Sequence, residues 1–255
     1  MKRFLYLSFF LFMIGNHAAA QSVSRADSLF QQANRLYEKG QYAEALDTYR
    51  QVEETGYESP ELYYNMGNAA YKLNRKALSI GYYNKALYLR PDFQAAKNNL
   101  RLMQRSLTDR IQPVPVPFYL KLRNRWVGLA STGTWALWSL VGIWLAFAVA
   151  LLYLFASRPA LKRISFLLIW LFLLIGSVSY MSYRVARTNR EKQTGVVAVP
   201  QAELYEQPGQ ENGKNSVLHE GTLVEITGQQ GDWYKVKTAD GNTFWLQKTN
   251  IFKIH

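Results

Sequence analysis

Residue types that support catalysis or metal binding are few in this chain of 255 residues, and they form no recognisable constellation. There is no cysteine, which excludes disulfides, thiolate metal sites and a cysteine nucleophile. The three histidines, His17, His219 and His255, lack the spacing of metal ligands. Glu53 and Glu54 are adjacent and point apart on a helix, and no glycine-rich phosphate loop is present. We therefore expect no enzymatic activity, no metal site and no cofactor.

Aromatic, amide and small residues suited to helix packing and binding recur with a period of 34 residues. Residues 26–59 align with residues 60–93 without a gap. The matched pairs are Ala33 and Gly67, Asn34 and Asn68, Tyr37 and Tyr71, Ala45 and Ser79, Leu46 and Ile80, Tyr49 and Tyr83, and Val52 and Ala86. This period is typical of tetratricopeptide (TPR) repeats, and residues 65–69, 85–87 and 90–91 resemble that family.

A TPR domain is expected over residues 21–106, as two repeats and a polar capping helix. The expected helices cover residues 25–39, 43–54, 61–73, 76–88 and 93–105. Two repeats are near the lower limit for independent stability. We therefore expect the domain to depend on a partner, a dimer or packing against the membrane-proximal segment.

The TPR resemblance implies that the first helix of each repeat lines a concave peptide-binding groove. The groove residues would be Phe30, Asn34, Tyr37, Tyr64, Asn68, Tyr71 and Lys72. An asparagine amide can donate to and accept from a peptide backbone. The alternative is that Asn34 and Asn68 only satisfy polar groups between helices.

The net charge of +12 is concentrated around two apolar runs. Residues 107–133 carry +3 and residues 134–193 carry +6. A basic excess beside apolar runs indicates a lipid bilayer before nucleic acid. We expect a membrane protein without a nucleic-acid partner.

The N-terminus has the pattern of a secretory signal peptide. Lys2 and Arg3 precede an apolar run at residues 4–14, and three alanines end at Ala20. This apolar run is too short to cross a bilayer as a helix. We expect a cleaved signal peptide at residues 1–20, with an uncleaved anchor as the alternative.

Residues 134–156 and 164–183 are each long and apolar enough to form a transmembrane helix. The link at residues 157–163 has three positive charges and no acid, so it predicts a hairpin with a cytoplasmic loop. Together with the signal peptide, this places both soluble domains in the periplasm of a two-pass inner-membrane protein. Neither span contains Asp, Glu, Lys, Arg or His, so we expect anchors rather than a transport path.

The linkers beside the spans are also basic. Arg184, Arg187, Arg190 and Lys192 lie in the linker at residues 184–194 and oppose the orientation that the loop favours. Charge alone therefore does not orient the hairpin, and the signal peptide decides between the two orientations.

A second linker covers residues 107–133 and begins with a proline-rich, extended stretch. Phe118, Leu122, Trp126 and Leu129 follow at near-helical spacing, interleaved with basic residues. This pattern predicts a segment that lies at the membrane interface. An ordinary helix packed on the preceding domain is the alternative.

At the C-terminus the pattern changes to the alternation of strands. Val224 and Ile226 alternate with polar residues, and Asp240-Gly241 separates two further runs as a hairpin turn. Residues 195–255 resemble the bacterial SH3-like (SH3b) domain through the stretches 220–226, 231–236 and 240–246. We expect a small all-β barrel.

The barrel has three aromatic residues suited to recognition, Tyr205, Trp233 and Trp245. An exposed patch of this kind would bind a peptide or a glycan, whereas the alternative is that the rings cover a small core. Gln247 to Asn250 replace the proline and tyrosine of a polyproline groove, which disfavours polyproline ligands.

The order of modules is similar to that of the BatE proteins of Bacteroides aerotolerance operons. The expected fold class is a multidomain α + β membrane protein with a TPR solenoid, a transmembrane helical hairpin and an SH3-like barrel. The resemblance implies a cell-envelope location, von Willebrand-type domain membrane proteins and a MoxR-type ATPase system as partners, and a role in aerotolerance or stress.

We interpret the chain as a membrane-anchored scaffold that binds proteins through both soluble modules, because tethering raises the effective concentration of weakly bound partners. The alternative is an envelope tether that binds peptidoglycan through the SH3-like domain. A further alternative, an accessory of a transport complex, would need a role for the hairpin beyond anchoring.

Overall fold

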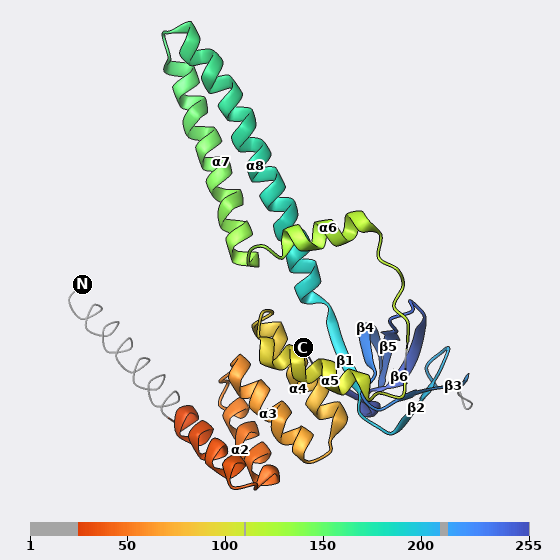
Figure 1. Ribbon diagram of the computed structural model, residues 1–255. Helices are drawn as coiled ribbons and strands as arrows, with labels where there is room; N and C mark the ends of the chain where they lie inside the picture. The colour runs from red at the N-terminus through yellow and green to blue at the C-terminus, as the bar shows by residue number, and fades with distance from the viewer. Residues whose placement is uncertain (1–24, 110, 210–213, 255) are drawn as a thin grey trace, which may run out of the picture. The chain divides into compact units, whose positions relative to one another are not determined.

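The computed structural model describes residues 25–109, 111–209 and 214–254, so the expected signal peptide lies outside the described residues. The chain divides into two compact units. One unit contains the helical repeats and the C-terminal strands, and the other covers residues 114–192. The expected fold class is confirmed as helical repeats, two long apolar helices and a C-terminal antiparallel β domain (Figure 1).

The repeat region consists of antiparallel helices whose bounds agree with the expected ones to within one residue. They are a helix at residues 25–38, α2 (Tyr42–Glu54), α3 (Pro60–Lys72), α4 (Lys76–Leu89) and α5 (Gln94–Arg105).

Local sequence sets the ends and the contacts of these helices. The Ser59 hydroxyl caps α3 by accepting from the Leu62 N–H at 3.0 Å, and Pro60 occupies the first turn. Gly40 and its repeat equivalent Asn74 adopt positive φ values of 79° and 57° in the turns. Gly67 lets α3 and α4 approach, since a Cβ atom there would lie 2.6 Å from the Tyr83 ring.

The C-terminal residues form two antiparallel sheets. The larger has the order β6-β5-β4-β1-β7, and the smaller pairs β2 with β3. The strands are β1 (Gln193–Val197), β2 (Gln201–Leu204), β3 (Lys214–His219), β4 (Leu223–Gln230), β5 (Trp233–Lys237), β6 (Thr243–Gln247) and β7 (Ile251–Lys253). The expected hairpin turn at Asp240-Gly241 joins β5 to β6, and Gly241 has a φ of 89°.

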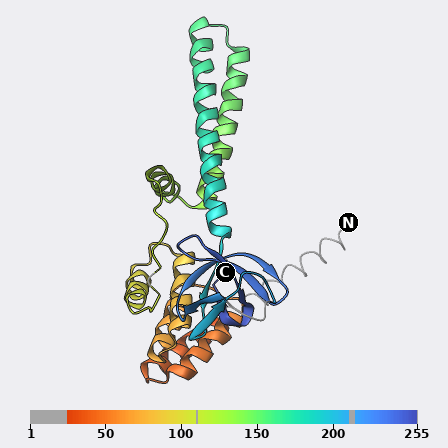
Figure 2. The ribbon, with the colours of Figure 1, turned by 90° about the vertical axis from the view of Figure 1, so that its right-hand side faces the viewer.

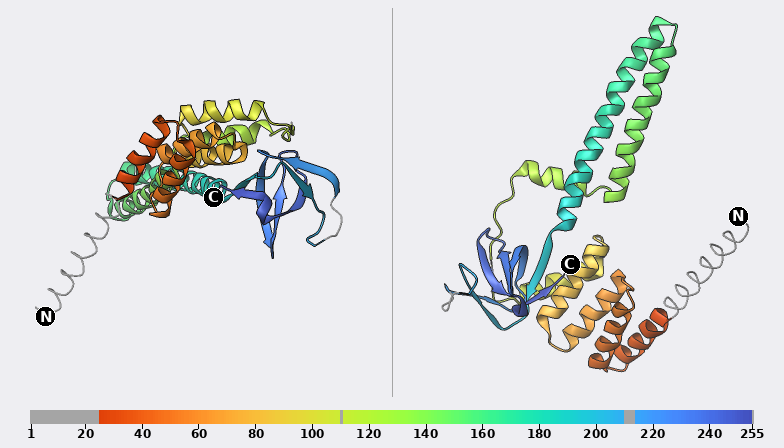
Figure 3. Two further views of the ribbon diagram at one scale, coloured as in Figure 1. Left: turned by 90° about the horizontal axis from the view of Figure 1, so that it is seen from below. Right: turned by 180° about the vertical axis from the view of Figure 1, so that it is seen from behind.

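The β domain packs directly on the last repeat, an arrangement that was not expected from the sequence (Figures 1 and 3). The Phe252 ring from β7 lies over Gly81 of α4, where a Cβ atom would overlap it, and stands edge-on to Tyr82 at 5.3 Å. Val196 and Ile254 are buried in the same apolar core as the repeat helices. The β domain therefore completes the core of the short repeat array.

A second tie joins the segment after α5 to the β domain. The Asp109 carboxylate accepts from the His219 backbone N–H and the Thr222 hydroxyl, both at 2.7 Å, and contacts the His219 ring at 2.6 Å. Burial alone would raise the pKa of Asp109, but these hydrogen bonds outweigh burial and lower the pKa. The carboxylate therefore stays ionised and holds this segment at neutral pH.

The second unit consists of α6 (Phe118–Val127), α7 (Thr132–Phe155) and α8 (Pro159–Glu191). The long helices α7 and α8 lie side by side (Figure 2). They meet through small residues, because a Cβ atom on Gly142 would lie 2.9 Å from the Gly176 backbone. Both are long and apolar enough to cross a membrane.

The bounds of α8 differ from the expected ones at both ends. The helix begins at Pro159 within the expected loop and continues to Glu191 through most of the expected linker at residues 184–194. Proline is favoured in the first helical turn, and Arg187 pairs with Glu191 at 2.7 Å one turn further along.

The contact between Gly81 and Phe252 is testable by a double-mutant cycle on the full chain. Gly81→Ala should destabilise the docked β domain by about 1–3 kcal/mol, because the methyl group forces the Phe252 ring to move. In the Phe252→Ala background the same change should cost less. Hydrogen exchange of α4 and β7, followed by mass spectrometry, measures both effects.

Gly228→Ala is the matched control, since its Cβ atom would meet only the Lys235 Cβ at an ordinary 3.7 Å. Equal penalties for Gly81→Ala with and without the Phe252 ring would show that the ring does not press on α4.

Candidate functional site

One hollow of the repeat region, with a volume of about 310 Å³, is lined by residues of the helix at residues 25–38 and of α3, α4 and α5. Its lining is aromatic and amide-rich, with an apolar side and one basic residue. The lining residues are Tyr37, Tyr64, Asn68, Tyr71, Lys72, Tyr83, Asn99, Leu102 and Met103. We refer to this hollow as the groove pocket.

The groove pocket brings together five of the seven residues expected from the sequence: Tyr37, Tyr64, Asn68, Tyr71 and Lys72. The remaining two lie elsewhere. Asn34 lines a neighbouring hollow of about 360 Å³ with Tyr37 and Glu38, and Phe30 packs on the Tyr49 ring at 5.8 Å.

Four lining residues were not expected from the sequence: Tyr83, Asn99, Leu102 and Met103. Three of them lie on α5, which was expected only to cap the solenoid. A signal was nevertheless present, because Asn99 follows Asn65 by one repeat period of 34 residues. Thus α5 occupies the place of the first helix of a third repeat.

The two asparagines predicted to bind a ligand backbone are centres of hydrogen-bond networks within the protein. Asn34 Oδ1 accepts from the Tyr49 hydroxyl at 2.6 Å and from Asn65 Nδ2 at 3.1 Å. One repeat later, Asn68 Oδ1 accepts from the Tyr83 hydroxyl at 2.8 Å and from Asn99 Nδ2 at 3.1 Å. Each network joins three successive helices.

The tyrosines in these networks are held protonated. Burial raises the pKa of Tyr83 to about 12, and burial also raises the pKa of Tyr49. Each phenol therefore donates to its asparagine carbonyl at neutral pH. Both amide carbonyls are satisfied internally, so a ligand would meet the other groups of the pocket.

The accessible part of the groove pocket consists of Tyr71, Lys72 and Leu102. The Tyr71 side chain is 57% exposed and Leu102 is 63% exposed. The Lys72 ammonium lies 5.9 Å from the centre of the Tyr42 ring, where it supplies positive charge beside the pocket. This combination fits a peptide that inserts an apolar side chain and presents a carbonyl or carboxylate nearby.

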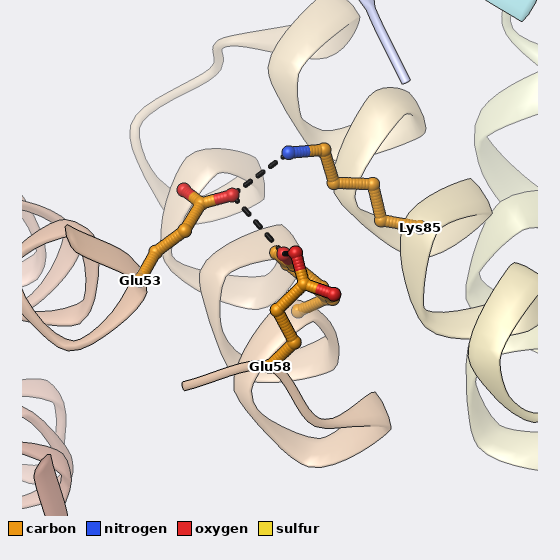
Figure 4. A network of polar contacts seen from close by, with 4 residues as sticks. Glu53, Glu58 and Lys85 are labelled. Atoms are coloured by element: carbon orange, nitrogen blue, oxygen red, sulfur yellow. Dashed lines mark hydrogen bonds and ion pairs between the residues drawn. The ribbon is translucent and has the colours of Figure 1, made fainter. Parts of the chain in front are cut away.

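A polar cluster behind the groove has a structural role (Figure 4). Lys85 pairs with Glu53 at 2.8 Å, and the Tyr63 hydroxyl donates to Glu53 at 3.1 Å and to Glu58 at 3.2 Å. The Lys85 ammonium also lies 4.9 Å from the Tyr63 ring centre and 5.7 Å from that of Phe252. The cluster joins α2, α3 and α4 to the docked β domain.

The expected aromatic patch of the β domain is brought together around neighbouring strands. The Tyr205 ring meets the Trp233 ring edge-on at 4.9 Å, and the Tyr205 and Trp245 backbones exchange hydrogen bonds at 3.1 and 2.8 Å. In the pairing of β5 with β6, Lys235 lies opposite Trp245, so Trp233 and Trp245 lie on one face. All three aromatic residues are half-buried, and a basic side chain lies among them.

Comparison with known families identifies both soluble modules. The family model described as tetratricopeptide repeat matches residues 30–92, and the model described as bacterial SH3 domain matches residues 200–251. Comparison with curated proteins finds no match. The predicted domain content is therefore confirmed for the repeats and the SH3 domain, two kinds of module that typically serve interaction.

Asn68 and Tyr83 should contribute to stability in a coupled way, because their side chains share a hydrogen bond. Asn68→Ala leaves the buried Tyr83 hydroxyl without its acceptor, and we expect a loss of about 1–3 kcal/mol in the free energy of unfolding. In the Tyr83→Phe background the loss should be smaller, because there is no hydroxyl to strand. Denaturant unfolding of the full chain in detergent, followed by far-UV circular dichroism, measures the cycle.

Asn98→Ala on the exposed side of α5 is the control, since Asn98 accepts a hydrogen bond from the Gln94 side chain of its own helix. Additive effects of Asn68→Ala and Tyr83→Phe would contradict the assigned network.

Proposed function

We propose that the chain is a membrane-anchored, non-catalytic scaffold that binds a partner protein through the groove pocket. The supporting observation is the lining of that pocket, in which exposed Tyr71 and Leu102 lie beside internally satisfied amides and Lys72. Exposed aromatic and aliphatic side chains around a hollow are the usual anchors of peptide recognition.

The proposed anchor is the pair α7 and α8, crossing the membrane as a hairpin. Their lipid-facing character is supported by large exposed apolar side chains along both helices, such as Trp144 and Leu174. The soluble unit is built from residues on both sides of this hairpin in the sequence. Two crossings return the chain to the side from which it left, as the assembly of that unit requires.

The proposed side is the periplasm, and the proposed setting is a BatE-type complex of the cell envelope. The leader and the basic link at residues 157–163 support this orientation. By resemblance, the partners would be von Willebrand-type domain membrane proteins, acting with a MoxR-type ATPase system in aerotolerance or stress.

A second candidate function is a tether that binds peptidoglycan through the SH3 domain. The observation that favours it is the Tyr205–Trp233 pair with Trp245 on the same face, since flat aromatic groups can stack on sugar rings.

Partner binding at the groove pocket is testable by site-specific photocrosslinking in intact membranes. A photoreactive phenylalanine analogue at Tyr71 should crosslink to a von Willebrand-type domain protein, and adding Leu102→Ala should reduce the yield about tenfold through loss of an apolar anchor. Gel mobility followed by mass spectrometry identifies the product.

The matched control places the same analogue at Tyr57, which is 42% exposed and lies outside the pocket lining. Equal crosslinking at positions 57 and 71 would argue against a groove site. Retention of the full chain on purified peptidoglycan that requires Trp233 but not Tyr71 would instead support the tether.

The orientation is testable by reporter fusions. Alkaline phosphatase, which is active only outside the cytoplasm, should be active when fused after Arg105 and inactive when inserted after Leu161. The reverse pattern would place the soluble unit, and its partners, in the cytoplasm.

A further inference from the structure

Helix α6 has a large apolar face that is exposed in the described structure. Successive helical residues turn by about 100°, which places Phe118, Tyr119, Leu122 and Trp126 within one arc. These four side chains and Leu129, in the turn after α6, are between 48% and 80% exposed. Val127, on the opposite side of α6, is buried. We refer to the five exposed residues as the α6 apolar face.

Basic side chains border this face on both edges. Lys121 and Arg125 lie on one edge and Arg123 on the other, while α6 contains no acidic residue. A hollow of about 520 Å³ on this face is lined by Tyr119, Leu122, Arg123, Arg125, Trp126 and Leu129. An apolar arc flanked by cations suits a bilayer surface, where long basic side chains reach lipid phosphates while apolar rings enter the acyl region.

Helix α6 is fixed to the same end of both long helices. The Trp126 indole N–H donates to the Ser182 hydroxyl of α8 at 3.1 Å, and the Trp126 ring lies 5.7 Å from the Trp135 ring of α7. The Trp135 indole N–H donates to the Val127 carbonyl at 2.9 Å. Trp135 is near the start of α7 and Ser182 is at the end of the apolar part of α8. Tryptophan is enriched at the membrane–water interface.

The direction of α6 agrees with this placement. Within the second unit, α6 crosses the end of the α7–α8 pair instead of continuing along it (Figures 1 and 3). If α7 and α8 span the bilayer, an element held across their end lies along the membrane surface. The α6 apolar face would then be continuous with the lipid-facing surface of the two spans.

We propose that α6 is an interfacial helix that binds anionic phospholipids, with the acyl chains against the α6 apolar face and the phosphates at Lys121, Arg123 and Arg125. This inference rests on the proposed membrane crossing of α7 and α8. The three cations without an acid favour an anionic lipid over a zwitterionic one and over a basic partner protein.

The absence of cysteine makes single-site labelling of the full chain straightforward. Spin labels are attached to Leu122→Cys, on the α6 apolar face, and to Asn124→Cys, an exposed position of α6 roughly opposite, in nanodiscs of phosphatidylcholine with phosphatidylglycerol. Collision rates with oxygen, which concentrates in lipid, and with a water-soluble nickel chelate are then compared. We expect the label at position 122 to collide more often with oxygen, and the label at position 124 to collide more often with the chelate.

Two results would overturn the proposal at this step. Equal access of the chelate to both labels would show that α6 lies in water. Protection of position 122 from both reagents would show that protein covers the face.

A label at Leu174, an exposed apolar residue of α8, separates this proposal from the proposed anchor. Leu174 in lipid together with Leu122 in water would overturn only the role of α6. Leu174 in water would overturn the membrane crossing itself.

The headgroup preference is tested with a fluorophore at position 122 and quenchers carried on the headgroup of phosphatidylglycerol or phosphatidylcholine. Each basic residue near an anionic membrane surface strengthens binding to that surface about fivefold. The triple variant Lys121→Gln, Arg123→Gln and Arg125→Gln should therefore reduce the preference for phosphatidylglycerol at least about tenfold.

The matched control removes three exposed basic residues from the helix at residues 25–38 and the turn after it, as Arg25→Gln, Arg35→Gln and Lys39→Gln. The preference should survive in this variant. An unchanged preference in the α6 triple variant, or an equal loss in both variants, would overturn the assignment of the phosphate-binding residues.

Discussion

The close packing of Phe252 on Gly81 is the contact on which the unit formed by the repeats and the β domain depends. It brings β7 against α4 and buries Val196 and Ile254 with the helices of the repeats. A short repeat array leaves its last apolar surface without a neighbour. Here the neighbour is the SH3 domain, from the far end of the same chain. This neighbour is neither a partner protein, nor a second copy, nor the membrane-proximal segment, which are the three that the sequence suggests.

Local pattern was sufficient to predict most elements. The 34-residue period located the repeat helices, and alternation with Asp240-Gly241 located the β5–β6 hairpin. It did not predict the docking, because Phe252 alternates like any strand residue and Gly81 resembles the other small residues of a packed helix. A sequence period shows which residues of a segment are buried, but it does not show whether the surfaces of two distant segments are complementary. The extension of α8 to Glu191 was not predicted either, because the end of an apolar run marks where a helix leaves the apolar environment and not where the helix itself ends.

The candidate site illustrates the same limit at the level of side chains. Asn34 and Asn68 stood out because they recur, and recurrence was consistent with either ligand binding or helix packing. The partners that satisfy their carbonyls, Tyr49 and Tyr83, recur at the same period. Because each asparagine recurs together with the tyrosine that it bonds, helix packing within the repeat is sufficient to explain why the asparagine recurs. Specificity is better sought at accessible positions such as Leu102, whose exposure could only be known from the structure.

The basic residues at the two ends of the α7–α8 pair favour opposite orientations in a membrane. Three basic residues lie in the link at residues 157–163, whereas seven lie at the other end, three of them in α6 and four at residues 184–192. Counting charge alone would place that more basic end in the cytoplasm, against the orientation that the expected signal peptide favours. Lipid phosphates are present on both surfaces of a bilayer, so basic residues that pair with them are compatible with either orientation. Anionic lipid at α6 would thus reduce the conflict between the charge count and the expected signal peptide from seven cations against three to four against three, because the α6 cations would serve binding at the surface and would not determine which end stays inside.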